Sequence, residues 1–163
     1  MKITGRLKEL IITKGGENVA PVLIEEEMKK EMPFLSHCVV IGDDRKYLTM
    51  LVTLKCEVDD SNFPSDRLDK VSLSVMASIG SKCTTVSEAR EDPLVDQYIQ
   101  QGMTRANERA LSRAHKVQKY TIQPEDLSPF TNTLTPTLKM KRKVIAQKYA
   151  EAIEVMYEEA AKL

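Results

Sequence analysis

The stretch SHCVVIGDDRKYLTMLVTLKC (Ser36–Cys56) decides the fold, because it holds two apolar runs joined by a Gly-Asp-Asp turn. In the second run, Leu48, Met50, Val52 and Leu54 alternate with more polar neighbours. Alternation with a period of two is typical of a β-strand, and a short glycine-containing turn is a common link between antiparallel strands. The sequence therefore predicts an antiparallel hairpin here.

Strand and helix patterns lie on both sides of this hairpin. Before it, ELIIT predicts a short strand over 9–13, Gly15–Gly16 a turn, and a helix begins at Pro21 and ends before Pro33. After it, a polar stretch precedes helices at 68–79 and 93–112, a strand at 116–124 and a last helix at 144–156. The predicted fold class is α+β: a small mixed or antiparallel sheet with helices packed on it.

The composition fits one ordinary soluble domain rather than a two-domain enzyme. The chain has 163 residues, and 42% of them are apolar, which is enough for a core of its own. Its 24 basic residues balance 24 acidic ones, so any recognition of an anion must be local. The three cysteines lack C-x-x-C spacing, which favours reduced, packed thiols over a zinc site or disulfides.

A cluster of cations follows a Thr/Pro-rich loop in NTLTPTLKMKRKVI (132–145). A lysine in such a loop is a compact cation on a long stem, suited to neutralising a carboxylate or phosphate during group transfer. Lys139 precedes the helical pattern, and the residues alone leave a catalytic role and a solvated surface position equally open. Lys141 and Lys143 are expected to lie on the solvated face of the last helix.

A second candidate region is GRLKELIITKGGENVAP (5–21), which places Arg6 and Lys8 before a strand and Gly15–Gly16 after it. Glycine permits positive φ and close approach of the backbone to a ligand. An ordinary hairpin turn explains the same glycines. Taken by itself, this region is weak evidence for a binding site.

Together the two regions resemble the motifs of the carboxy-terminal domain of the acyl-adenylate-forming enzymes. This superfamily includes acyl-CoA synthetases, peptide-synthetase adenylation domains and firefly luciferase. GRLKELIITKGGENVAP is similar to its Gly-Arg-x-Lys/Asp-Glu…Gly-x-Asn-x-x-Pro core motif, and TPTLKMKR is similar to the terminal motif with the catalytic lysine. The segments ITKGGENVAP, IGDDRKYLTMLVTLKC, TTVSEAR and PTLKMKR most resemble the bubblegum-type long-chain fatty acid–CoA ligases.

The resemblance implies a role for each motif position. Lys139 would contact the carboxylate and the α-phosphate while the acyl-adenylate forms. Arg6 would orient the nucleotide near its ribose, and Lys8 would be the hinge about which the domain turns between two states. The loop that lines the pantetheine channel in the second state would consist of Gly15, Gly16, Glu17 and Asn18.

The sequence departs from the family pattern in three places. Leu138 stands where many relatives have glycine, and Lys8 stands where many have aspartate. Residues 57–92 exceed the length of the usual lid and are expected to be a family-specific insertion. Residues 1–163 are accordingly expected to form one lid domain, whose partner is an N-terminal adenylation domain that this chain does not contain.

The function implied is that of one part of a long-chain fatty acid–CoA ligase that uses ATP, Mg²⁺ and CoA. The chain contains no Gly-rich phosphate-binding loop, so the isolated domain is expected to be inactive and to hold none of these tightly. The expected location is the cytoplasm, with peripheral contact with the endoplasmic reticulum membrane left open. No run of eighteen apolar residues predicts a membrane span.

The alternative is a free-standing interaction module that docks on an anionic partner through its basic loop. Nucleic acid is an improbable partner, because the net charge is zero and no aromatic residues accompany the cations. No metal site is predicted. His115 has no ligand at metal-binding spacing, and His37 is expected to be packed or hydrogen-bonded.

Overall fold

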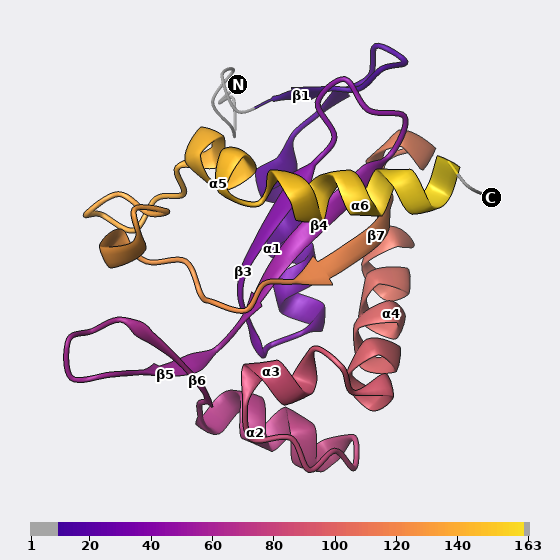
Figure 1. The fold of residues 1–163 in the computed structure, drawn as a ribbon. Helices are drawn as coiled ribbons and strands as arrows, with labels where there is room; N and C mark the ends of the chain where they lie inside the picture. Colours follow the sequence, from indigo (N-terminus) through magenta and orange to yellow (C-terminus); the bar gives the residue numbers. More distant parts are fainter. Residues whose placement is uncertain (1–9, 162–163) are drawn as a thin grey trace, which may run out of the picture.

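The computed structural model describes residues 10–161 and is built around a three-stranded sheet (Figure 1). Strand β3 (Leu35–Ile41) pairs antiparallel with β4 (Leu48–Leu54), and Cys38 lies opposite Val52. Strand β7 (Val117–Ile122) lies parallel to β4, so the strand order is β3–β4–β7. The predicted hairpin and the α+β fold class are confirmed.

Strand β4 is covered on both faces, and all of its residues are buried. Its large apolar side chains join a core with α1 (Pro21–Glu31) and α4 (Pro93–Asn107). Leu51 belongs to a second core on the opposite face. Two threonines share that face, and their hydroxyls donate hydrogen bonds to the Tyr157 hydroxyl and to a carboxylate. Because both threonine hydroxyls are hydrogen-bonded, neither is left buried without a partner.

The second core is closed by α5 (Arg142–Lys148) and α6 (Ala150–Ala161), which pack on the side of the sheet away from α1 (Figure 1). The sequence predicted one helix here, beginning near 144. The structure has two helices, and α5 ends at Lys148, with Tyr149 between it and α6. The interruption allows Ile145 of α5 and Ile153 of α6 to enter the same core.

Residues 57–64, where the sequence predicted only a polar stretch before a helix, form part of a hairpin. Strands β5 (Cys56–Val58) and β6 (Pro64–Leu68) form a projecting antiparallel hairpin, seen at the lower left of Figure 1. Helices α2 (Lys70–Ser78) and α3 (Val86–Ala89) follow. The polar composition concealed the hairpin because its turn is stabilised by side chain to backbone bonds rather than by apolar packing.

The remaining elements are short. Strands β1 (Ile11–Ile12) and β2 (Asn18–Val19) pair antiparallel, and the 3₁₀ turns are η2 (Arg113–His115) and η3 (Pro129–Thr131).

Helix α4 ends at Asn107, earlier than the predicted 112. The Asn107 side chain pairs with both the N–H and the C=O of Val117 at 3.0 and 2.9 Å. That pairing leads the chain from the helix into β7.

Candidate functional site

Lys139 lies exposed in a tight loop between η3 and α5. Its N–H donates to the Thr135 hydroxyl at 3.0 Å, and its C=O accepts from the Thr135 N–H at 2.8 Å. The Leu138 N–H also donates to the Thr135 C=O at 2.8 Å. The backbone under the lysine is thus fixed by local bonds, while the ammonium group projects from the loop on a long stem.

The residue before the lysine has an unusual backbone conformation. Leu138 has φ of 67°, in the left-handed region that glycine enters without steric cost. Its side chain is 65% exposed, so burial does little to offset the strain. The leucine is therefore under backbone strain that glycine at this position would not have.

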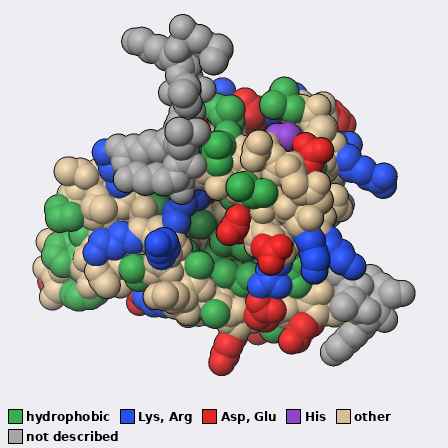
Figure 2. Space-filling model, turned by 90° about the horizontal axis from the view of Figure 1, so that it is seen from above, with side chains coloured by type: hydrophobic (Ala, Val, Ile, Leu, Met, Phe, Trp, Pro, Cys, Tyr) green, Lys and Arg blue, Asp and Glu red, His purple; other side chains and the backbone are tan. Residues whose placement is uncertain are grey.

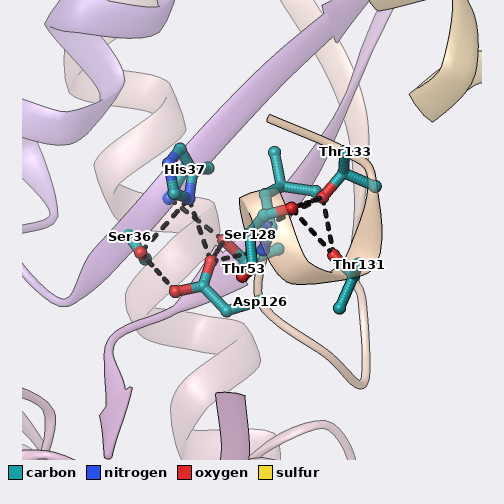
Figure 3. Close-up of polar contacts among 8 residues, drawn as sticks. Ser36, His37, Thr53, Asp126, Ser128, Thr131 and Thr133 are labelled. Carbon is teal, nitrogen blue, oxygen red and sulfur yellow. Dashed lines mark hydrogen bonds and ion pairs between the residues drawn. The ribbon is translucent and has the colours of Figure 1, made fainter. Parts of the chain in front are cut away.

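The segment that leads to the loop is anchored by Asp126 (Figure 3). Its carboxylate accepts from the Thr53 and Ser36 hydroxyls at 2.6 Å each and from His37 Nδ1 at 2.9 Å. It also accepts from the Leu127 N–H at 2.8 Å. The donors come from β3, β4 and the segment itself, so one carboxylate ties the start of this segment to the sheet.

Opposing effects act on the pKa of Asp126. Burial raises the pKa, but hydrogen bonds from His37, Ser36 and Thr53 lower it by more, so the net pKa lies below its ordinary value. The ionised carboxylate is therefore the form that the folded state favours. The sequence-based expectation that His37 is hydrogen-bonded is confirmed by this contact.

Beyond Asp126, hydroxyl groups tie η3 to the strand-like start of the lysine loop (Figure 3). The Ser128 N–H donates to the Thr133 hydroxyl at 2.9 Å, and the Thr133 N–H donates back to the Ser128 C=O at 3.1 Å. Thr131 and Thr133 hydroxyls lie 2.9 Å apart. The loop base continues to the Lys141 N–H, which donates to the Thr133 C=O at 2.9 Å. Displacing η3 would therefore displace the base of the Lys139 loop.

The far end of the loop is anchored by a buried ion pair. Arg142 donates from Nη1 and Nη2 to both carboxylate oxygens of Glu25 at 2.8 and 2.7 Å, and Glu25 also accepts from the Val40 N–H at 2.8 Å. Glu25 lies beyond the first turn of α1, which has no acidic residue, and it is buried against a partner 117 residues away.

A groove of about 610 Å³ separates α1 from the lysine loop. Its lining includes Lys139, His37, Lys29 and the ion pair of Glu25 and Arg142. Lys141, expected on a solvated helix face, instead precedes α5 and donates to the Asn132 side chain at 2.6 Å. The cations of this region therefore have different environments, and Lys139 is on the loop itself.

The other predicted site residues lie in the β1–β2 turn. Gly15, Gly16, Glu17 and Asn18 are exposed, and Gly16 has φ of 84° with open space around its Cα. The Thr13 N–H donates to the Glu17 C=O at 3.0 Å, which closes the turn. Arg6 and Lys8 lie outside the described residues.

From residue 10 onward, the structure does not bring the two predicted regions together. The β1–β2 turn projects at the top of Figure 1, whereas the loop between η3 and α5 projects at the left. Within residues 10–161, no three His, Cys, Asp or Glu side chains are grouped as a metal site would require. In the same range, no helix combines the length and apolarity needed to cross a bilayer.

Comparison with known protein families identifies the family of this chain. The sequence profile of the family described as AMP-binding enzyme C-terminal domain matches residues 8–126. The chain belongs to this family. The match covers the β1–β2 turn, the whole three-stranded sheet and Asp126, and it ends before the terminal motif that contains Lys139.

Curated relatives of this AMP-binding C-terminal domain are fatty acid ligases. Long-chain-fatty-acid–CoA ligase ACSBG1 of Bos taurus is 46% identical over 160 residues, which are 96% of this chain and 22% of that protein. The ACSBG1 of Homo sapiens gives the same values. ACSBG2 of Xenopus laevis is 44% identical over 161 residues, 97% of this chain and 22% of that protein. The chain thus spans about a fifth of the length of these relatives.

Solved structures show the same fold at low identity. The A domain of the carboxylic acid reductase from Segniliparus rugosus, in complex with AMP and a co-purified carboxylic acid, matches with a TM-score of 0.67. The identity is 18%, and the match covers 96% of this chain and 21% of that one. The A domain of the carboxylate reductase from Mycobacterium chelonae matches with a TM-score of 0.61 at 20% identity, over 94% of this chain and 20% of that one.

Proposed function

We propose that this chain is the C-terminal lid of an ATP-dependent long-chain fatty acid–CoA ligase and that Lys139 acts in its first half-reaction. In that step a fatty acid carboxylate attacks the α-phosphorus of ATP, giving acyl-AMP and pyrophosphate; CoA thiol then displaces AMP to give the thioester. The observation that supports the proposal most strongly is an exposed lysine on a loop anchored at both ends, in a chain of this family.

The anchored loop suits an electrostatic role for Lys139. Negative charge is shared between the attacking carboxylate and the phosphate oxygens, and a positioned ammonium group stabilises the transition state without forming a covalent bond. Such stabilisation requires a backbone that does not reorganise during the reaction. The bonds between Lys139 and Thr135 supply that fixed backbone, and the stem supplies reach.

The second half-reaction is assigned to the β1–β2 turn. Gly15 and Gly16 leave the backbone bare, and with Glu17 and Asn18 they would line a narrow channel for the pantetheine arm of CoA. Because this turn and the lysine loop project in different directions (Figure 1), one bound substrate meets both only if the domain reorients. Lys8 is the proposed hinge for that movement, and Arg6 is the proposed nucleotide contact.

The proposed partner is an N-terminal adenylation domain, which would hold ATP with its Mg²⁺ and the fatty acid. Residues 57–92 are proposed to be an insertion specific to this type of lid. The proposed location is the cytoplasm, and peripheral membrane contact is the alternative. The isolated chain is expected to form no acyl-CoA.

A chimeric enzyme tests the proposal. In the ACSBG1 ligase of Bos taurus, the part that matches this chain is replaced by it, and Lys139→Ala is compared with Lys143→Ala, an exposed lysine on α5. Acyl-AMP formation from fatty acid and ATP is measured separately from thioester formation from supplied acyl-AMP and CoA. We expect Lys139→Ala to slow the first step by about 10²-fold or more and to spare the second. Equal losses in both steps, or equal effects of the two variants, would contradict the proposal.

The interaction-module alternative has less support from the surface. On the face seen in Figure 2, the visible Lys and Arg side chains are interspersed with acidic and hydrophobic ones rather than gathered in one basic field. Arg142 is committed to Glu25, and Lys141 to Asn132. A partner that recognised a basic loop would find few of its cations presented together.

A further inference from the structure

The β5–β6 hairpin has no role in the proposed half-reactions, yet it reaches the segment that holds Lys139. Phe63, in the hairpin turn, packs against Phe130 of η3 with ring centroids 5.6 Å apart and an interplanar angle of 48°. Phe63 is 41% exposed and Phe130 is 55% exposed. Two aromatic rings from segments 67 residues apart, both near the surface, thus meet at the base of the lysine loop.

The hairpin turn is built to hold its aromatic ring in place. The Asp59 carboxylate accepts from the N–H groups of Ser61 and Phe63 at 2.8 and 3.0 Å, and the Asp59 N–H donates to the Phe63 C=O at 2.9 Å. Asn62 takes φ of 66°, which the tight turn requires. At the other end of the hairpin, Leu68 is buried in the main core. The ring of Phe63 is therefore at the tip of a short, braced arm.

The partner ring belongs to an element that cannot move alone. The Phe130 N–H donates to the Ser128 hydroxyl at 3.0 Å, and Ser128 exchanges two bonds with Thr133. Thr133 in turn accepts from the Lys141 N–H, two residues beyond Lys139. Contact at Phe130 is thus connected through hydrogen bonds to the backbone on both sides of the lysine.

We propose that the β5–β6 hairpin braces the lysine loop, and that Phe63 is a positioning residue that acts on Lys139 through Phe130. The proposal rests on the proposed function of Lys139 and gives a role to part of the inserted region 57–92. Asp126 and the Glu25–Arg142 pair fix the two ends of the segment, and the aromatic contact restrains η3 between them.

The first test measures the loop directly in this chain, without any activity. Amide hydrogen exchange is followed at Lys139, whose N–H is bonded to the Thr135 hydroxyl, in Phe63→Ala, in Phe63→Tyr and in the control Val58→Ala. Val58 lies on the same hairpin and is 59% exposed. We expect roughly two- to tenfold faster exchange in Phe63→Ala only, the range that one aromatic pair supports. Unchanged exchange, or equal acceleration in Val58→Ala, would overturn the brace.

The second test measures catalysis in the chimeric ligase. Phe63→Ala and Phe130→Ala should each slow acyl-AMP formation by a similar roughly two- to tenfold factor, and the double variant should be no slower than either one. Phe63→Tyr should restore the rate, and thioester formation from supplied acyl-AMP should not change. Additive losses, or equal losses in both half-reactions, would refute a positioning role.

Lys139→Ala, measured in the same enzyme, separates the two proposals. If it abolishes acyl-AMP formation while Phe63→Ala has no effect, the brace is wrong and the function of Lys139 stands. If Lys139→Ala has no effect, the proposed function is wrong, and the exchange measurement alone still decides whether the hairpin restrains the loop.

Discussion

Replacing Asp126 with asparagine probes the anchor at the start of the lysine segment. The change keeps the shape of the side chain and removes its charge. Asparagine Oδ1 can still accept from Thr53, but Nδ2 takes the place of the oxygen to which the Ser36 hydroxyl now donates at 2.6 Å. The Ser36 hydroxyl can rotate and accept instead. The variant therefore exchanges charge-assisted bonds for neutral ones, without opening a cavity.

The size of the effect follows from the bonds that lose their charge. Three side chains donate to Asp126, from Thr53, Ser36 and His37 at 2.6 to 2.9 Å. A hydrogen bond to a charged group contributes about 1 kcal/mol more than a neutral one, so the free energy of unfolding should fall by about 2–3 kcal/mol at pH 7. Glu125→Gln is the matched control: this exposed carboxylate is 3.4 Å from Lys148, and its loss should cost under about 1 kcal/mol.

The pH dependence of stability shows whether the charge of Asp126 or the shape of its side chain stabilises the fold. Because the pKa of Asp126 is depressed in the folded state, its stabilisation is fully present above the unfolded pKa of about 3.9 and is lost as pH falls through the lower folded value. Urea unfolding of this chain and of its Asp126→Asn variant should thus give two free energies of unfolding. Their difference should be constant near neutrality and should narrow below about pH 4. The reasoning would be refuted if the two proteins differed in stability by the same amount at pH 7 and below pH 4. It would also be refuted if they did not differ at pH 7.

Two further substitutions test the other features of the loop. Glu25→Gln should lower the free energy of unfolding by about 2–4 kcal/mol, because it removes the carboxylate charge that the partly buried Arg142 contacts. Glu26→Gln, at an exposed position, should have little effect in the same urea titration. Leu138→Gly should raise the free energy of unfolding by up to about 1 kcal/mol, because glycine adopts the left-handed backbone of this position without strain. Leu138→Ala should give no such gain. Equal effects of the two substitutions would show that the backbone is not strained.

The parts of the fold that the sequence predicted are those encoded by local pattern. The β3–β4 hairpin, α1 and α4 each have their apolar spacing, turn or proline within a few residues, so a short window is sufficient. The β5–β6 hairpin escaped notice because the Asp59 side chain organises its turn, and β5 and β6 have few buried apolar residues. The turn-forming stretch DDSNF (59–63) was the one available signal.

The contacts that hold the candidate site, unlike the hairpin and the helices, are not encoded by local pattern. Lys139 was predicted from its motif, whereas the anchors of its loop could not be predicted, because they join residues distant in sequence. Asp126 meets Ser36 across 90 residues, and Arg142 meets Glu25 across 117. Neither acid belongs to either sequence motif, and Glu25 is one of three consecutive glutamates. Only the pairing of β3 with β4 and the packing of α1 bring their partners within reach.

The three restraints on the lysine loop should have different consequences when they are lost. Asp126 and Glu25 tie the segment to the sheet and to α1 inside the fold, so weakening either one lowers global stability together with any effect on the loop. The Phe63–Phe130 contact lies at the surface, and breaking it frees η3 while both cores stay packed. Loss of stability should therefore accompany changes at the buried anchors, and a selective loss of adenylation rate should accompany changes at the hairpin. An enzyme that retained full adenylation with a loosened η3 would show that Lys139 needs no fixed backbone, and the positioning argument would have to be abandoned while the charge of Lys139 could still act.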